Sequence, residues 1–495
     1  MSTSPLPHVL YRADIVRKGE QLAAQTHDIA MYTLMERAGQ AVFTHLCQSY
    51  PQATQVLVCC GGGNNGGDGY VVARLAKEAG MAVTLWHSGD ATKLCGDAAL
   101  ARDAWLAAGG KIAAVGSSVP TDADIIVDAI LGTGLTGTVR PAQQALIETI
   151  NASTLPVIAI DVPSGLCADS GAQLGAAIVA TSTVTFIGVK QGLVTGQAHN
   201  YVGELCFAGL EVDATFQQQQ STWVQLIPND LVTRYLGTRQ RTAHKGEHGR
   251  VTCFGGDLGM AGAIRLASEA CARTGAGLTA VVTQPDNVLS IVAARPEIMA
   301  KGWFEKAHEI QQQRDWSDVV VLGPGLGTQD WGKALYFHLA DYEKKLVVDA
   351  DGLNLLALSP DYKNNRIITP HPGEAARLLG CTVAEIEADR YAAVRQLQQK
   401  YGGVVVLKGA GTLVDDGQYC YVCRAGNPGM ATGGMGDVLS GVIGALLAQK
   451  LSLIEAAQLG VWLHSYAADL CAQEGERGML ASDLFPYIRQ LVNAR

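Results

Sequence analysis

The sequence predicts an α/β protein built from two α/β/α sandwich domains. The chain has 495 residues, which is more than one hydrophobic core usually organises. It contains two successive series of short apolar, mostly β-branched runs, and helical patterns separate the runs. Because these runs do not alternate between polar and apolar residues, they are typical of parallel strands that are covered on both faces. Many runs end in glycine-rich turns, and the chain has 57 glycines.

Composition excludes several classes of function. Hydrophobic residues make up 48% of the chain and charged residues 17%, which is a globular profile, and the formal net charge is −9. An acidic protein lacks the basic face that nucleic-acid binding requires. The longest strongly apolar run, residues 438–448, is too short to span a bilayer, so we expect no membrane association. The first ten residues do not form a signal peptide pattern, and we expect a cytoplasmic protein.

The first series of runs predicts five parallel strands. The expected strands are 56–60, 83–87, 125–130, 156–161 and 183–187. The expected helices are 26–46, 70–79, 98–108 and one that begins after Arg140, because Pro141 suits the first position of a helix. The polyglutamine tract Gln217–Gln220 is the only low-complexity segment, and it places the domain boundary nearby, giving domains 1–222 and 223–495.

The second series predicts six strands, a hairpin and a long apolar helix. The expected strands are 250–254, 278–283, 319–322, 346–349, 367–369 and 404–408, followed by a hairpin over 412–424 and a helix from about 437 to 449. Ligands of open parallel sheets bind beyond the carboxyl ends of the strands. The candidate motifs of both halves lie at those ends.

Residues 61–69, Gly-Gly-Gly-Asn-Asn-Gly-Gly-Asp-Gly, directly follow the strand 56–60. Six glycines in nine residues leave many backbone N–H groups able to face an anion. The run lacks the Gly-Lys-Ser/Thr ending of a P-loop. An ordinary turn would not need two amides and a carboxylate among its glycines, so the pattern favours a binding loop.

Residues 132–137 match G-x-G-x-x-G, and Asp161 ends the next strand. Alone, this pattern predicts a dinucleotide-binding dehydrogenase. However, the motif follows the third strand rather than the first, and the next helix is expected only at Pro141. We therefore expect nucleotide contact without hydride transfer, with a ligand-free turn as the alternative. Asp161 itself could be a base, a cation ligand or a turn cap.

Three hard oxygen donors, Asn65, Asp128 and Ser164, also follow or end strands of the first series. Together they could bind a monovalent cation or Mg²⁺.

In the second half, residues 427–437 run into an apolar helix and contain a cluster of glycines. A glycine-rich backbone before a helix N-terminus can hold an anion. Asp437 could then accept a proton from a substrate hydroxyl while N–H groups hold phosphate oxygens. The alternative, a helix cap, accounts for the aspartate but not for the glycines.

Other motifs of the second half also lie at strand ends. Lys408 to Thr412 offer one cation and free amides to a nucleotide phosphate, and residues 323–327 could allow a ligand close to the backbone. Residues 349–354 supply acids, and residues 369–374 place His371 on a rigid turn. The basic segment 244–250 is either a solvated loop or an anion-binding segment.

These motifs resemble two known families. The second half resembles the ribokinase-like superfamily through residues 434–437, and it resembles the NAD(P)HX dehydratases more closely through five ordered motifs at 323–327, 349–354, 369–374, 408–412 and 427–437. The first half resembles the Rossmann-like NAD(P)HX epimerases, of the YjeF N-terminal type, through 61–69, Asp128 before 132–137, and 161–165. This order of domains resembles that of bifunctional NAD(P)H-hydrate repair enzymes.

The resemblance implies an isomerase and a lyase in one chain. NADH and NADPH can add water at C6 of the nicotinamide, which gives R and S hydrates called NADHX and NADPHX. The first domain would interconvert the two forms. The second would dehydrate the S form at the expense of ADP, giving AMP and phosphate. We also expect a homo-oligomer.

Residue roles follow from the matched motifs. Asp437 and Asp161 would be catalytic. The hydrate would contact Asn64, Asn65, Gly66, Gly67, Asp68, Gly132, Thr133, Gly134, Leu135, Thr136, Gly137, Thr138, Asp161, Gly325, His371 and Asp437. The adenine nucleotide would contact Lys408, Gly409, Ala410, Gly411, Thr412 and Gly436. The resemblance also implies K⁺ on Asn65, Asp128 and Ser164, and Mg²⁺ with ADP in the second domain.

Two rival interpretations remain open at this point. A ribokinase-like small-molecule kinase with a fused nucleotide-binding domain would use the same helix start at Asp437. The first half could instead be a nucleotide-sensing scaffold without catalytic activity.

Overall fold

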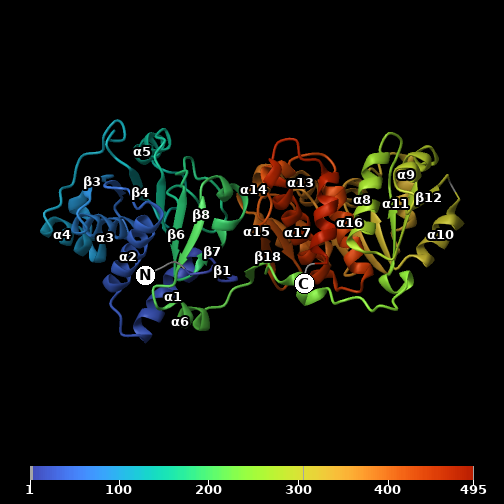
Figure 1. The fold of residues 1–495 in the computed structure, drawn as a ribbon, viewed down its shortest axis with the longest axis horizontal. Helices are drawn as coiled ribbons and strands as arrows, with labels where there is room; N and C mark the ends of the chain where they lie inside the picture. The colour runs from blue at the N-terminus through green and yellow to red at the C-terminus, as the bar shows by residue number, and fades with distance from the viewer. Residues whose placement is uncertain (1–3, 305, 494–495) are drawn as a thin grey trace. The chain divides into compact units, whose positions relative to one another are not determined.

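The computed structural model describes residues 4–304 and 306–493. The chain divides into two compact units, Met1–Val224 and Gln225–Arg495 (Figure 1). Each unit has a largely parallel sheet with helices packed against it, so the predicted fold class is confirmed. Within the described ranges, no helix is long and apolar enough to cross a membrane.

Unit 1 contains a parallel sheet with the order β3-β2-β4-β5-β6-β8. The strands are β2 (Gln55–Cys60), β3 (Ala82–His87), β4 (Ile125–Ala129), β5 (Val157–Ile160), β6 (Ser182–Phe186) and β8 (Glu204–Ala208). A separate parallel pair joins β1 (Val9–Tyr11) to β7 (Val189–Lys190). The helices are α1 (Ala13–Thr26), α2 (Met31–Ser49), α3 (Asn64–Glu78), α4 (Gly96–Ala107), α5 (Pro141–Asn151) and α6 (Asp213–Gln219).

Both faces of this sheet are buried, as the apolar runs predict. Alternate residues of β2 belong to two different hydrophobic cores. Val56 and Val58 pack with α2, α3 and α4, whereas Leu57 packs with α5. Successive side chains of a strand point to opposite faces, so a run without polar residues requires helices on both sides.

The glycine-rich run after β2 is helical, which corrects the predicted loop. α3 begins at Asn64, whereas the sequence predicts a start at Tyr70. Its glycines permit close packing: a Cβ on Gly66 would collide with the carbonyl oxygen of Gly61, and one on Gly69 would lie 2.6 Å from the Cβ of Ala129. The amino end of α3 therefore lies directly against the carboxyl ends of the strands.

The predicted helix over 26–46 corresponds to α2 but starts too early, because its first residues are the end of α1 and the turn that follows. α1 ends at Thr26 and α2 begins at Met31. Asp28 adopts a positive φ of 53° between them, and Ile29 N–H donates to the Ala24 carbonyl. A residue in the left-handed region commonly ends a helix. Because the sequence has neither Pro nor Gly at this position, the break could not be predicted.

Unit 2 contains a sheet with the order β12-β11-β10-β13-β14-β15-β16-β17-β18. Its strands are β10 (Arg250–Phe254), β11 (Leu278–Thr283), β12 (Met299–Gly302), β13 (Val319–Leu322), β14 (Lys345–Val348), β15 (Arg366–Ile368), β16 (Val404–Leu407), β17 (Thr412–Asp415) and β18 (Cys420–Cys423). The pairs from β12 to β16 are parallel, and β16, β17 and β18 pair antiparallel, as the predicted hairpin requires. β9 (Val224–Leu226) spans the division between the units.

The helices of unit 2 cover both faces of its sheet. They are α7 (Leu231–Tyr235), α8 (Ala261–Thr274), α9 (Val288–Ala294), α10 (Ala307–Trp316), α11 (Asp330–His338), α12 (Asp351–Leu358), α13 (Pro372–Leu379), α14 (Val383–Ala388), α15 (Arg390–Tyr401), α16 (Met435–Ala448), α17 (Leu453–Cys471) and α18 (Leu484–Leu491). α8, α16 and α17 form one core with Val251 and Cys253 of β10. On the opposite face, Gln313 of α10 donates to the hydroxyl of Thr252 at 2.8 Å.

The α8–α16 contact gives a stability prediction. A Cβ on Gly441 would collide with the Ala267 carbonyl oxygen and lie 2.7 Å from the Cβ of Ala270. Overpacking of this kind costs about 1–3 kcal/mol, so Gly441→Ala should lower the free energy of unfolding by about that amount in urea denaturation. Gly262→Ala, also on α8, is the matched control because no atom lies within 4 Å of its added Cβ. Equal stability of the two variants would contradict this packing.

Candidate active sites

Unit 1 contains a cavity of about 570 Å³ at the carboxyl ends of its strands. The predicted hydrate-binding residues that line it are Asn64, Asn65, Asp68, Gly132, Thr133, Gly134, Leu135, Thr136, Thr138 and Asp161. Three predicted residues do not line it. Gly66 and Gly67 are buried inside the α3 packing, and Gly137 forms a turn with a φ of 73°. The two motifs that are far apart in sequence therefore meet at one cavity.

Asp161 lies in this cavity beside a buried lysine that the motifs did not predict. The side chain of Lys190 is 2% exposed, and its Nζ donates to Asp161 Oδ1 and, at 3.1 Å, to the Phe186 carbonyl. Asp161 also accepts from the Thr185 hydroxyl at 3.1 Å. Its φ of 64° is rare for a non-glycine residue. Strain of this kind is common where a side chain must be aimed at a ligand.

Two further acids, Glu20 of α1 and Asp68 of α3, line the same cavity. Burial raises the pKa of Glu20 to about 7, although Lys190 lowers it. Burial, reinforced by Asp161 and Glu20, also raises the pKa of Asp68 well above its usual value. The cavity thus combines the buried Lys190, its paired carboxylate and two further acids whose pKa values are raised. Glu20 was not predicted from the sequence.

Asn65 and Ser164 meet at the backbone of Leu131, and Asp128 bonds to Ser164. Asp128 is fully buried and accepts from the Ser164 hydroxyl at 2.6 Å and from the Ser164 N–H at 2.8 Å. The Asn65 amide and the Ser164 hydroxyl both donate to the Leu131 carbonyl, at 3.0 and 3.1 Å. Burial raises the pKa of Asp128 to about 6. A buried carboxylate among neutral oxygen donors suits a monovalent cation.

In unit 2, Lys408, Asp349 and Ser440 form a buried polar group at the carboxyl ends of β14 and β16. Lys408 Nζ lies 2.8 Å from Asp349 Oδ1, and the Ser440 hydroxyl donates to Asp349 Oδ2 at 2.7 Å. Glu374 lies 3.7 Å from the same lysine nitrogen. Burial opposes the charge of Lys408, but Asp349 and Glu374 raise its pKa. The lysine is therefore a fixed positive charge at the sheet edge.

Asp437 is the third residue of α16, and its carboxylate interacts electrostatically with Lys408, Asp349 and Glu374. Burial and, to a lesser degree, the charge of Asp349 raise the pKa of Asp437 to about 7, although Lys408 lowers it. Gly434, in the left-handed region with a φ of 91°, is the N-cap, and no side chain caps the helix. The alternative role of Asp437 as a cap is thus not observed. A Cβ on Gly436 would lie 3.1 Å from Lys408 Nζ, so this glycine lets the lysine reach the helix start.

The loop 323–327 lies between this group and the start of α8. The sequence motifs did not predict that α8 borders the site. A Cβ on Gly325 would lie 2.7 Å from the Cβ of Met260. Gly327 N–H donates to Asp351 at 2.9 Å, and Asp351 is one of the charges that raise the pKa of Asp437. Gly325 therefore packs against the start of α8, and Gly327 bonds to one of the acids that act on Asp437.

His371 has a structural role that the sequence did not assign to it. It is the N-cap of α13, and its Nδ1 accepts from the Gly373 N–H at 3.0 Å, while Glu374 completes a capping box. Its side chain is half exposed, and its Nε2 lies 3.5 Å from Glu374 Oε1. Burial and Lys408 lower its pKa. The neutral Nε2–H remains available to a ligand at the same edge.

The segment Gly409 to Thr412 turns between β16 and β17. Gly409 and Gly411 have φ values of 133° and 62°. A Cβ on Gly409 would lie 2.9 Å from the Arg390 guanidinium, which donates to the Lys408 carbonyl at 3.1 Å. In the glycine-rich segment before α16, the Asn427 amide donates to Asp469 of α17 at 2.9 Å. Both glycine-rich segments are thus fixed by buried or half-buried partners.

Comparisons with known proteins agree with this arrangement. Residues 31–192 match the family described as YjeF-related protein N-terminus, and residues 251–490 match NAD(P)H-hydrate dehydratase. The bifunctional NAD(P)H-hydrate repair enzyme Nnr of Vibrio cholerae is 52% identical over 490 residues, covering 99% of each chain. That of Escherichia coli is 50% identical over 495 residues, covering 99% of this chain and 95% of its own.

A solved structure supports the fold of unit 2. A ribokinase-like superfamily protein of Enterococcus faecalis is 29% identical with a TM-score of 0.51, and the match covers 55% of this chain and 96% of that one. Since both family models match in the predicted order and the high identity extends over nearly the whole chain, this protein belongs to the family of bifunctional NAD(P)H-hydrate repair enzymes.

Proposed function

We propose that this chain repairs hydrated NADH and NADPH, with an epimerase in residues 1–222 and an ADP-dependent dehydratase in residues 223–495. The observation that carries the proposal is the carboxylate of Asp437 at the start of α16, beside the buried Lys408–Asp349 pair. The whole-chain identity to repair enzymes supports this function over a small-molecule kinase. A homo-oligomeric assembly and a cytoplasmic location stay predictions.

In the dehydratase, Asp437 acts as the general base. It takes the proton of the C6 hydroxyl, whose oxygen attacks the β-phosphorus of ADP, and AMP leaves. The resulting phosphate ester is a far better leaving group than hydroxide. The ring nitrogen then expels phosphate from C6, and loss of a C5 proton restores NADH or NADPH.

The surrounding residues hold the nucleotide during this step. The amino end of α16 and the glycine backbone before it offer N–H groups to the transferred phosphate. Lys408 supplies a fixed positive charge, and the turn Gly409 to Thr412 together with Gly436 leaves room for the nucleotide. We expect ADP to arrive as its Mg²⁺ complex, which would neutralise part of its charge. Gly325 and His371 would contact the hydrate.

In the epimerase, interconversion requires hydroxide to leave C6 on one face and return on the other. Glu20, with a pKa of about 7, would protonate the departing hydroxyl, and Asp68, which lines the same cavity, would contact the hydrate. Asp161, fixed by Lys190, would stabilise the cationic ring and take the proton of the returning water. The loop 132–138 and Asn64 would hold the remainder of the nucleotide.

We propose that K⁺ binds to Asn65, Asp128 and Ser164. The support is the chemistry of the donors: the Asn65 amide and the Ser164 hydroxyl both bond to the Leu131 carbonyl, and the same hydroxyl bonds to the buried carboxylate of Asp128. K⁺ would fix the loop that follows β4, and Gly132 begins the hydrate-binding segment there.

One experiment tests the proposed function directly. The full-length protein is incubated with a purified mixture of R and S hydrates and with ADP, ATP or no nucleotide. We expect the NADH absorbance to recover completely with ADP, because epimerisation supplies the S form, and AMP and phosphate to appear in equal amounts. ATP-dependent phosphorylation of vitamin precursors without hydrate repair would support the kinase alternative instead.

Dehydration should depend on pH with a midpoint near 7. The pKa of Asp437 is raised to about 7, chiefly by burial, and a general base acts only when ionised. The kcat/KM for the S hydrate should therefore rise as pH increases through about 7 and level off above it. Initial rates between about pH 5 and about pH 9, corrected for the reaction without ADP, measure this. A flat profile would argue against Asp437 as the base.

A further inference from the structure

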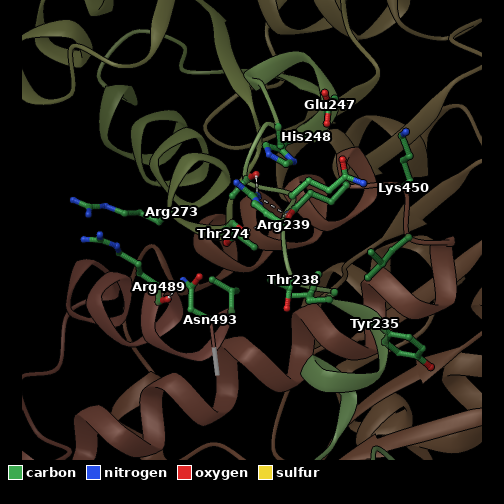
Figure 2. Close-up of a pocket in the computed structure, with 18 of the residues that line it drawn as sticks. Tyr235, Thr238, Arg239, Glu247, His248, Arg273, Thr274, Lys450, Arg489 and Asn493 are labelled. Atoms are coloured by element: carbon green, nitrogen blue, oxygen red, sulfur yellow. Dashed lines mark hydrogen bonds between the residues drawn. The ribbon is translucent and has the colours of Figure 1, made fainter. Parts of the chain in front are cut away.

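Unit 2 contains a cavity of about 790 Å³ that does not include Asp437. Its walls are the segment 235–248, the carboxyl ends of α8 and α16, and the end of α18 (Figure 2). α16 has Asp437 in its first turn and reaches this cavity at Gln449. Since a helix rises 1.5 Å per residue, roughly 20 Å separate the cavity from the active site.

The cavity is strongly basic. The cationic side chains that line it are Arg239, Arg241, Arg273, Lys450 and Arg489. Among the described lining residues, Glu247 is the only acid, and its carboxylate lies 3.2 Å from His244. Figure 2 shows Arg273 and Arg489 extending in the same direction at one end of the cavity. In a chain of net charge −9, such a concentration of positive charge favours an anion.

Several groups fix the shape of this cavity. Arg239 donates to the Gly275 carbonyl at 2.6 Å and to the Gln449 side chain at 2.9 Å, so it ties the segment 235–248 to the ends of α8 and α16. Gly275, with a φ of 108°, leaves room for this guanidinium. The buried hydroxyl of Thr274 has no hydrogen-bond partner among the described residues. It remains a donor next to the cations.

We propose that this cavity binds a multiply charged phosphate compound of about the size of a nucleotide. Guanidinium groups match phosphate oxygens in geometry and charge. The volume lies in the range of small-molecule sites, roughly 300–1,000 Å³, and Tyr235 and Leu236 add an aromatic and an apolar surface. Glu247 and His248 of the basic segment 244–250 also line the cavity. This site does not depend on the proposed catalytic function.

Isothermal titration of the full-length protein with inorganic tripolyphosphate tests the proposal. The titrated protein carries Lys408→Met, which removes the cation of the dehydratase site. We expect one saturable site per chain, and we expect its affinity to fall as salt rises from about 50 to about 200 mM. Absence of saturable binding would overturn the proposal.

Two double variants in the same background locate the binding. Arg241 and Arg489 are exposed and form no ion pair with a described residue, so Arg241→Gln with Arg489→Gln should preserve folding, as thermal melting will show. This change should weaken binding at least about tenfold. Lys306→Gln with Lys333→Gln removes two exposed charges elsewhere in unit 2 and should leave affinity unchanged. Equal affinity of both double variants would place the anion elsewhere and refute the site.

Discussion

Asp437→Asn should abolish ADP-dependent dehydration while epimerisation continues at the normal rate. The substitution preserves the volume of the side chain but removes the base that accepts the hydroxyl proton. A positioned general base contributes about 10²–10⁴-fold in rate, so kcat should fall by that factor. With ADP present, NADH absorbance measures dehydration, and without ADP the R and S signals of the hydrate in NMR measure epimerisation.

A matched control and a stability measurement separate this role from a structural one. Asp330→Asn removes an exposed first-turn acid of α11 and should leave both activities intact. Equal loss of both activities in Asp437→Asn would contradict separate sites.

Stability should change in the opposite direction from activity. The pKa of Asp437 is raised from 3.8 to about 7, so the folded state binds its proton more tightly than the unfolded chain. The contribution of this group is fully favourable below about pH 4 and is lost as pH rises to about 7. Asp437→Asn should therefore melt at a higher temperature than the natural protein at pH 8, with the difference vanishing near pH 4. A variant that is less stable at pH 8 would show that the carboxylate holds the fold together.

Much of the fold could be predicted because burial on both faces leaves a clear pattern. β10 and β13 coincide with their predicted ranges, since short runs rich in β-branched residues, such as Val319–Leu322, favour buried strands. β12, with the sequence Met-Ala-Lys-Gly, was missed because it lies at a sheet edge and Met299 is 41% exposed. β8 was missed as well; its five residues include Glu204 and Cys206, which break the β-branched pattern.

Site residues could be predicted where the backbone conformation requires glycine. Single functional side chains outside such motifs were harder to predict. Residues 132–136 line the cavity of unit 1, and at 434–437 the Lys408 side chain approaches the backbone of Gly436. Glu20 lies among other charges of α1 and carries no signal of its own. Lys190 carried a weak sequence signal. A lone lysine between Ile187, Val189 and Leu193 must either be exposed or pair with a buried acid.

Lys190→Met should strongly slow epimerisation and leave dehydration unchanged. The lysine is buried and holds Asp161, so its loss leaves that carboxylate unpaired and misplaces it against the ring. We expect the enzymatic R-to-S rate, corrected for the spontaneous reaction, to fall by about 10²–10⁴-fold. Lys18→Met, which removes a lysine that is 74% exposed on α1, is the matched control and should have no effect.

The residual activity distinguishes a chemical from a purely structural role. Lys190 lowers the pKa of Glu20, whereas burial raises it to about 7. If Glu20 is the acid, epimerisation in the natural enzyme falls as pH rises above about 7. In Lys190→Met this fall should move to higher pH, and in Glu20→Gln it should disappear. An unchanged midpoint in Lys190→Met would show that the lysine only supports the fold of the cavity. Combining Lys190→Met with Asp161→Asn should cost little beyond either change alone, because residues that act as one pair are not additive.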